Sequence, residues 1–418
     1  MDRLDRAPSG DPRAAPPAET ERSFPAPAGP LWRAEPFRLF FPLAVVLGWV
    51  GIGHWLLYAL GVTATYSCRS HGLVQTQAFM MAFAVGFLLT AIPRRTRAAA
   101  PTPGEMTAIA AALILTTAAA ISERWLATQL SYGACFAILL RFALRRLLGA
   151  TAARRPPAAF VLIPIGAAHG IAGAALLALA ALDRGPAYAL GLGTLLVEQG
   201  VFLCFVVGVG SLVLPLMAGA PPPADLGSAP GERWKACAYA AAGVAIFSSL
   251  VLEHAGWLRA GPLLRAGIVA AGLAVGGGAW HPPGKPGLHR RLVWLAVWLI
   301  PLGLALAGIL PDYRVPALHV LFIGGFGLLA FGVATHVTLG HLGLEALALG
   351  RPPAVVVLGT TLLLATAARF VADWSDSYFA HLGWAAGLWI VGSATWLGFV
   401  AFAVLDPRPA TSELRILD

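Results

Sequence analysis

Charged residues are scarce in this sequence. Only 12% of its 418 residues are Asp, Glu, Lys or Arg, whereas 58% are hydrophobic. A soluble domain carries about 25% charged residues, so this composition excludes an ordinary soluble protein and predicts an integral membrane protein. The net charge of +9 at pH 7 comes mostly from arginine. Because no basic stripe with interleaved aromatic residues is present, this charge indicates membrane orientation and lipid contact, and not nucleic-acid binding.

Cysteine is also scarce. The chain has four cysteines, no CxxC pair and no CxxCH motif, which excludes a zinc ribbon, a thioredoxin-like site and covalently attached haem. Cys135 and Cys204 lie within apolar runs and are interpreted as small core residues. Residues 1–36 contain no apolar core of the signal-peptide type, so we expect a disordered cytoplasmic tail there.

Long apolar segments fill the rest of the chain. A helix needs about 20 apolar residues to cross a bilayer, and the sequence predicts an all-α bundle of twelve such helices over residues 37–406, followed by a short cytoplasmic tail at 407–418. The sixth segment is long enough to tilt, or to break at Gly208, Gly210 and Pro215. The expected spans are 39–60, 72–93, 105–122, 127–148, 158–182, 186–217, 236–255, 258–279, 292–310, 316–338, 353–372 and 378–405.

The basic residues predict an orientation for these spans. Of the 29 lysines and arginines, 21 fall in the N-terminal tail and every second connection, five fall in the other connections, and three fall within spans. Cytoplasmic connections carry the excess of Lys and Arg. We therefore expect both termini in the cytoplasm and an even number of spans.

Five of the ten histidines gather toward the predicted outer face. Neutral imidazole is the commonest metal ligand, and a buried haem b needs one or two axial imidazoles. The group therefore predicts ligation of haem or a metal, although a single histidine at a membrane interface is as often an ordinary hydrogen-bonding residue. The five are His54, His71, His254, His319 and His381.

Helix geometry limits which of the histidines can act together. His319 and His336 are 17 residues apart on one span, which is about 25 Å along a helix axis, so they cannot share one metal. His336 and His341 are expected at the inner end, where His341 remains a separate candidate ligand; His281 and His289 are expected in an inner loop.

Two neighbours of His71 share its helix face. Gln75 is four residues on and could orient its imidazole, or could form an ordinary hydrogen bond between helices. Cys68 is three residues before His71, a spacing that would suit copper through thiolate and imidazole.

Ionisable residues within spans are candidates for function, because charge is costly in a bilayer. Glu198 lies in the middle of the sixth span and His169 in the middle of the fifth. Arg141 and Arg369 are candidates to bind haem propionates or Glu198. Arg265 is expected to extend to the membrane face instead.

Two segments resemble the NnrS family of polytopic bacterial membrane proteins. The first is His71–Pro93, "HGLVQTQAFMMAFAVGFLLTAIP", and the second is His319–Gly343, "HVLFIGGFGLLAFGVATHVTLGHLG". Two positions depart from the family pattern: His336 and Ser211 each stand where family members often carry arginine. These departures are typical of a divergent branch.

The resemblance implies a protein of the bacterial inner membrane that holds haem b and copper and is linked to nitric oxide stress and denitrification. It implies no particular catalysis. Two alternatives remain. One is a transporter for a small solute, with Glu198 and His169 along its path. The other is a membrane oxidoreductase of the haem–copper oxidase kind, which needs adjacent histidines that this sequence does not have.

Overall fold

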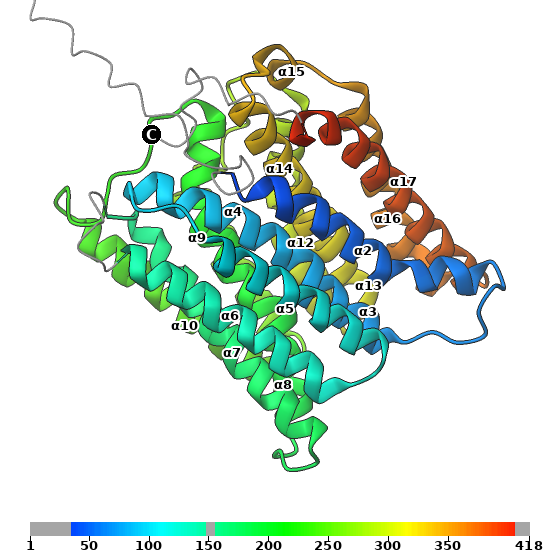
Figure 1. Ribbon diagram of the computed structural model, residues 1–418. Coiled ribbons are helices and arrows are strands. Elements are labelled where there is room, and N and C mark those ends of the chain that lie inside the picture. Colours follow the sequence, from blue (N-terminus) through cyan, green and yellow to red (C-terminus); the bar gives the residue numbers. More distant parts are fainter. Residues whose placement is uncertain (1–34, 148–154, 406–418) are drawn as a thin grey trace, which may run out of the picture.

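The computed structural model describes residues 35–147 and 155–405, and in these ranges the chain is a helical bundle without strands (Figure 1). The predicted all-α fold is confirmed. Residues 1–34 of the predicted N-terminal tail and the whole C-terminal tail lie outside the described residues. The last two residues of that predicted N-terminal tail, Glu35 and Pro36, are buried.

Twelve helical segments cross the bundle in the described ranges, as predicted. Eleven are long and apolar enough to span a membrane, and the eighth, Ala260–Gly276, is shorter. Seven are α2 (Phe37–Ala59), α5 (Pro103–Ile121), α6 (Trp125–Leu147), α10 (Glu232–His254), α12 (Leu288–Ile309), α16 (Pro353–Val371) and α17 (Tyr378–Leu405).

The other five contain a 3₁₀ or π-helical stretch. They are α3–η1–α4 (Cys68–Val74, Gln75–Met80, Met81–Thr96), η2–α7 (Ala158–Val161, Leu162–Ala181), α8–η3–α9 (Ala189–Leu195, Leu196–Gly200, Val201–Ala218), α11–η4 (Ala260–Ala271, Gly272–Gly276) and α13–η6–α14 (Arg314–His319, Val320–Gly327, Leu328–His341). Short elements occupy the connections: η5 (Pro311–Tyr313), α15 (Glu345–Leu349) and η7 (Ala372–Trp374).

Of the two possibilities for the sixth span, the break at Gly208, Gly210 and Pro215 does not occur. The irregular stretch is η3, and α9 continues through Gly208, Gly210 and Pro215 to Ala218. A Cβ on Gly208 would lie only 3.1 Å from the carbonyl oxygen of Ala159. This glycine therefore allows close packing against η2 without breaking the helix. Pro215 lies near the end of α9, so the backbone hydrogen bond that it cannot donate is lost only close to the helix terminus.

Three spans form the centre of the bundle. The most apolar stretch of α3–η1–α4 is 83% buried, that of α13–η6–α14 is 72% buried and that of α8–η3–α9 is 67% buried, against 28–56% for the other long spans. Each central span contains a π-helical stretch. On the outside, α16 and α17 cover one side of the bundle, and α6, α7 and α10 cover the opposite side (Figure 1).

The bundle has two ends, which we name after two histidines. At the His71 end, α2 finishes and α3, α13 and α17 begin. At the His341 end, α2 begins and α4 and α14 finish. Twelve crossings return the chain to the side on which it started, as an even number requires. Which end faces the cytoplasm remains a prediction from the basic residues.

A buried ion network ties three helices together at the His341 end. The carboxylate of Glu35, which precedes α2, lies 2.6 Å from Arg38, 3.4 Å from Arg94 on α4 and 3.2 Å from Nδ1 of His341 on α14. Burial disfavours ionisation of Glu35, but the hydrogen bonds and charges of His341 and Arg38 outweigh burial and lower the pKa of this carboxyl.

We expect Glu35→Gln to lower the melting temperature of the purified protein at pH 7, because breaking a buried ion network costs on the order of 3 kcal/mol. A lowered pKa means that the charged carboxylate contributes fully above the ordinary value of 4.5 and that its contribution is lost as the pH falls below it. The difference from the parent protein should therefore shrink toward acidic pH. The exposed Glu345 supplies the control, Glu345→Gln. Equal melting of parent and Glu35→Gln at pH 7 would refute the role of the network.

Candidate functional site

The π-helical stretches of the central spans adjoin the predicted site residues. His71 lies one turn before η1, His319 is the last residue of α13 immediately before η6, and Glu198 lies within η3. A π-helical turn holds an extra residue and is frequent at functional sites because it changes the direction of nearby side chains. The most buried spans thus carry both the irregular backbone and the polar residues.

The imidazoles of His71 and His319 face each other at the His71 end. Their ring centroids are 6.4 Å apart and their planes differ by 5°. The ring of His54 lies 6.0 Å from that of His71, and the ring of Trp55 lies 5.9 Å from it, both nearly edge-on. The prediction that His71 and His319 lie together is confirmed, and His54 joins them.

Backbone carbonyls fix the orientation of both imidazoles. Nδ1 of His71 is 2.9 Å from the carbonyl oxygen of Gly51, and Nδ1 of His319 is 2.8 Å from that of Val315. A carbonyl oxygen only accepts hydrogen bonds, so in each ring Nδ1 carries the proton and the neutral imidazole keeps its lone pair on Nε2. Histidines that bind metals usually donate their second N–H in this way.

Two glycines of α2 let α3 and η1 approach closely. A Cβ on Gly51 would lie 2.7 Å from both Nε2 of Gln75 and Cγ1 of Val74. The carbonyl of Gly51 accepts from His71, and that of Gly48 accepts from Nε2 of Gln75 at 2.8 Å. Gln75 thus forms the hydrogen bond between helices that the sequence left open. Sequence reasoning missed Gly48 and Gly51, although two glycines three residues apart lie on one face of a helix.

Glu198 lies against the backbone beside His71. A Cβ on Gly72 would be 2.9 Å from Oε1 of Glu198, so this glycine makes room for the carboxylate. Arg369 is buried, lies 2.6 Å from Asp373, and is near enough to interact electrostatically with both His71 and His319. Arg141, by contrast, is exposed on α6.

The other histidines of the predicted outer group are arranged differently. Nδ1 of His381 lies 3.1 Å from the carbonyl oxygen of Ser377 at the start of α17. His254 is exposed and its ring contacts Tyr188.

His169, from the middle of α7, is buried with its Nδ1 3.8 Å from Sγ of Cys204. Cys135 and Cys204 are both buried, as predicted.

A second set of histidines occupies the His341 end, as expected from helix length. Nε2 of His289 lies 3.1 Å from Nδ1 of His336, and His341 bonds Glu35. The expectation that His289 lies in a loop is wrong, because α12 begins one residue earlier and His289 is buried. The preceding Gly287 has φ of +126° and ends the loop there.

The expectation that Arg265 extends to the membrane face is also wrong. Arg265 is fully buried and pairs with Glu253 of α10, and it lies 3.3 Å from Oγ of Ser249. Glu253 also pairs with Arg314 of α13. Sequence reasoning overlooked Glu253 because it falls at a helix end, next to His254, where a solvated charge is common.

Among the described residues, the histidines do not gather into a group large enough to surround a metal ion. In residues 35–147 and 155–405, no group of three or more His, Cys, Asp or Glu side chains is placed to hold a metal ion. Cys68, the predicted thiolate partner of His71, is exposed at the start of α3. The His71 end therefore brings together two imidazoles, each with its lone pair on Nε2, and a third ring, that of His54, lies close to His71.

Comparison with protein families matches nearly the whole described chain. The profile of the family described as NnrS protein covers residues 30–408. No curated protein matches the chain. The family match spans all twelve helices and both segments on which the sequence resemblance was based.

We expect Gly51→Ala to disturb the His71 end, because its Cβ would push α3 and η1 away from α2. Overpacking of this kind costs about 1–3 kcal/mol. Gly53 on the same helix is the matched control: a Cβ there meets nothing within 4 Å, so Gly53→Ala should be neutral or stabilising by about 0.5–1 kcal/mol. Thermal melting of both variants tests the contact, and equal melting of the two would contradict it.

Proposed function

Because the chain belongs to the NnrS family, we propose that it is a multi-pass membrane protein that binds copper through His71 and His319 and acts in the response to nitric oxide. The observation that carries this proposal is the parallel imidazole pair, in which each Nδ1–H bonds a carbonyl and each Nε2 keeps its lone pair.

The spacing of the imidazoles suits one shared metal ion. With a metal–nitrogen bond of about 2.0–2.1 Å and roughly 1.1 Å from nitrogen to ring centre, two imidazoles on one ion have centroids at most about 6.4 Å apart. The His71–His319 separation is 6.4 Å and the His54–His71 separation is 6.0 Å. Imidazole is a good ligand for copper, and at the 6.4 Å limit both Nε2 atoms would lie on a nearly straight line through the ion.

The fit to haem b is weaker at the same place. His54 and Trp55 pack edge-on against His71, so a macrocycle at this ring would compete with them for space. Haem b therefore stays an expectation from the family resemblance, with Arg369 near the histidines as the candidate for its propionates. Arg141 lies exposed on α6, facing away from the bundle interior.

Bound copper would supply a redox-active centre that binds small uncharged ligands such as nitric oxide. The residues of the chain support such a centre: the carbonyls of Gly51 and Val315 accept from the two imidazoles, and the carboxylate of Glu198 lies against Gly72, the residue after His71. The link to nitric oxide and denitrification rests on the family resemblance.

A transporter for a small solute is the second candidate. It is favoured by Glu198, an acidic residue in an irregular stretch of a central span, since ionisable residues on broken membrane helices often mark a solute path. Metal content separates the two proposals, because the transporter needs no metal.

We expect the purified protein to hold copper, and His71→Ala or His319→Ala to lose it, since each substitution removes one of two ligands. Gln75→Ala should only weaken copper binding, by about 10–100-fold, because Gln75 would not ligate the ion: its amide bonds the carbonyl of Gly48 and so positions α3 and η1 against α2. Copper per protein by mass spectrometry gives the measurement, and an optical spectrum tests for haem.

His254→Ala is the control for this experiment, because His254 is an exposed histidine at the same end, packed against Tyr188. It should keep full copper content. Retention of copper by a folded His71→Ala,His319→Ala double variant would overturn the proposal, and a colourless, metal-free parent protein would favour the transporter.

A further inference from the structure

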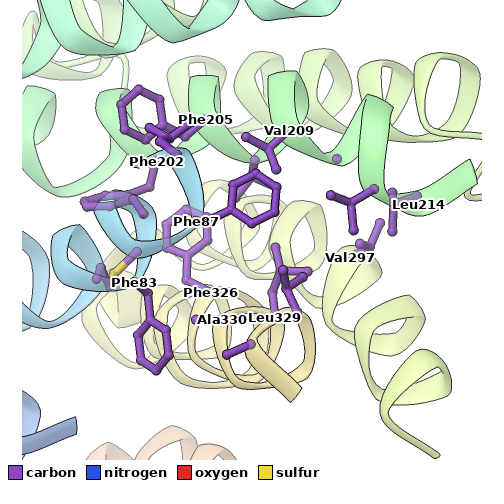
Figure 2. Close-up of a pocket in the computed structure, with 18 of the residues that line it drawn as sticks. Phe83, Phe87, Phe202, Phe205, Val209, Leu214, Val297, Phe326, Leu329 and Ala330 are labelled. Carbon is purple, nitrogen blue, oxygen red and sulfur yellow. The ribbon is translucent and has the colours of Figure 1, made fainter. Parts of the chain in front are cut away.

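An apolar pocket lies between the central spans, on the His341 side of the site. Its cavity volume is about 120 Å³, and its walls come mainly from α4, α9, η6 and α14. Figure 2 shows phenylalanine rings around the space. Six phenylalanines line it: Phe41, Phe83, Phe87, Phe202, Phe205 and Phe326.

The pocket wall offers nothing for water to bind. None of the side chains that line it carries nitrogen or oxygen; the only heteroatom among them is the sulfur of Met80. A buried water needs two to four polar partners, and an apolar cavity of about 150 Å³ in another protein stays dry and binds benzene or xenon. This pocket is partly open, but it has a similar volume and an equally apolar lining, so it is suited to the same class of molecule.

Aromatic contacts connect the pocket with the His71 end. The ring of His319 contacts Phe322 at 6.2 Å, and Phe322 contacts Phe326 in the pocket wall at 6.2 Å. Phe326 in turn contacts Phe202 at 6.0 Å. The histidine and the pocket are therefore joined by an unbroken series of rings along η6.

The other two central spans make the same connection. Met80, the last residue of η1, lines the pocket and lies nine residues after His71. Phe202 lies four residues after Glu198, and residues four apart share a helix face. Each of the three spans thus carries a polar site residue and, about one to three helical turns further along the chain, residues that line the pocket.

We propose that this pocket binds a small, uncharged, apolar molecule of roughly the size of xenon to benzene, and that such a molecule reaches the His71–His319 pair through it. The binding itself stands without the copper proposal; only the delivery to the histidines rests on the proposed function. The carbon lining selects against ions and strongly polar solutes, because these would lose their hydration without gaining a partner.

Xenon tests the binding directly. Crystals of the full chain under xenon pressure should show one xenon peak among the six phenylalanines. Ala330→Phe and Ala84→Leu, on two different spans, should fill the pocket and abolish the peak. Ala111→Phe, at an exposed alanine of α5, should keep it. Absence of xenon from the parent pocket, or a lipid or detergent chain filling it, would overturn the proposal.

Carbon monoxide tests the delivery. In the Cu(I)-loaded protein, rebinding of carbon monoxide after flash photolysis should be at least about tenfold slower in Ala330→Phe than in the parent, with copper content unchanged. Unchanged rebinding would refute the route while leaving xenon binding intact. A protein that takes up no copper would refute the proposed function, and the xenon experiment would still decide the pocket.

Discussion

The hydrogen bond between His71 and the carbonyl of Gly51 sets the arrangement of the His71 end. Within a bilayer there is no water to satisfy an imidazole N–H, so it must find a partner inside the bundle. A helix carbonyl has a second lone pair to offer, and the absence of a side chain at Gly51 lets α3 come close enough to use it. The direction of Nε2, and thus the chemistry open to the histidine pair, follows from this contact.

The same requirement organises the buried charges. Glu253 holds Arg265 and Arg314 and so joins α10, α11 and α13, while Glu35 joins the start of α2 to α4 and α14. Both acidic residues lie near helix ends. A buried ion pair adds little when compared with apolar packing, but the loss of one partner is costly. These networks therefore specify which helix ends meet more than they strengthen the bundle.

The sequence predicts the membrane spans more reliably than it predicts the contacts between them. A run of about 20 apolar residues crosses a bilayer as a helix, so twelve helices could be predicted from composition and length. Depth along a helix also placed His71 and His319 together. Depth does not reveal which helices are neighbours, so Gly51 and Glu253, the partner of Arg265, were missed. The π-helical stretches were not predicted, for another reason. Their residues are those of ordinary membrane helices, and only packing against neighbouring helices selects the wider turn.

His336 shows how a departure from the family pattern fits its surroundings. The sequence resemblance implies arginine at this position, but the neighbours of His336 are His289, Arg290 and His341. An arginine at 336 would add a further fixed positive charge near Arg290 and Lys285 in a buried place, at a cost in repulsion. The hydrogen bond between His289 and His336 instead needs one nitrogen without a proton, so at least one ring of the pair is neutral. Two imidazoles from α12 and α14 thus replace a charged contact with a neutral one, and the His341 end keeps its packing without a further anion.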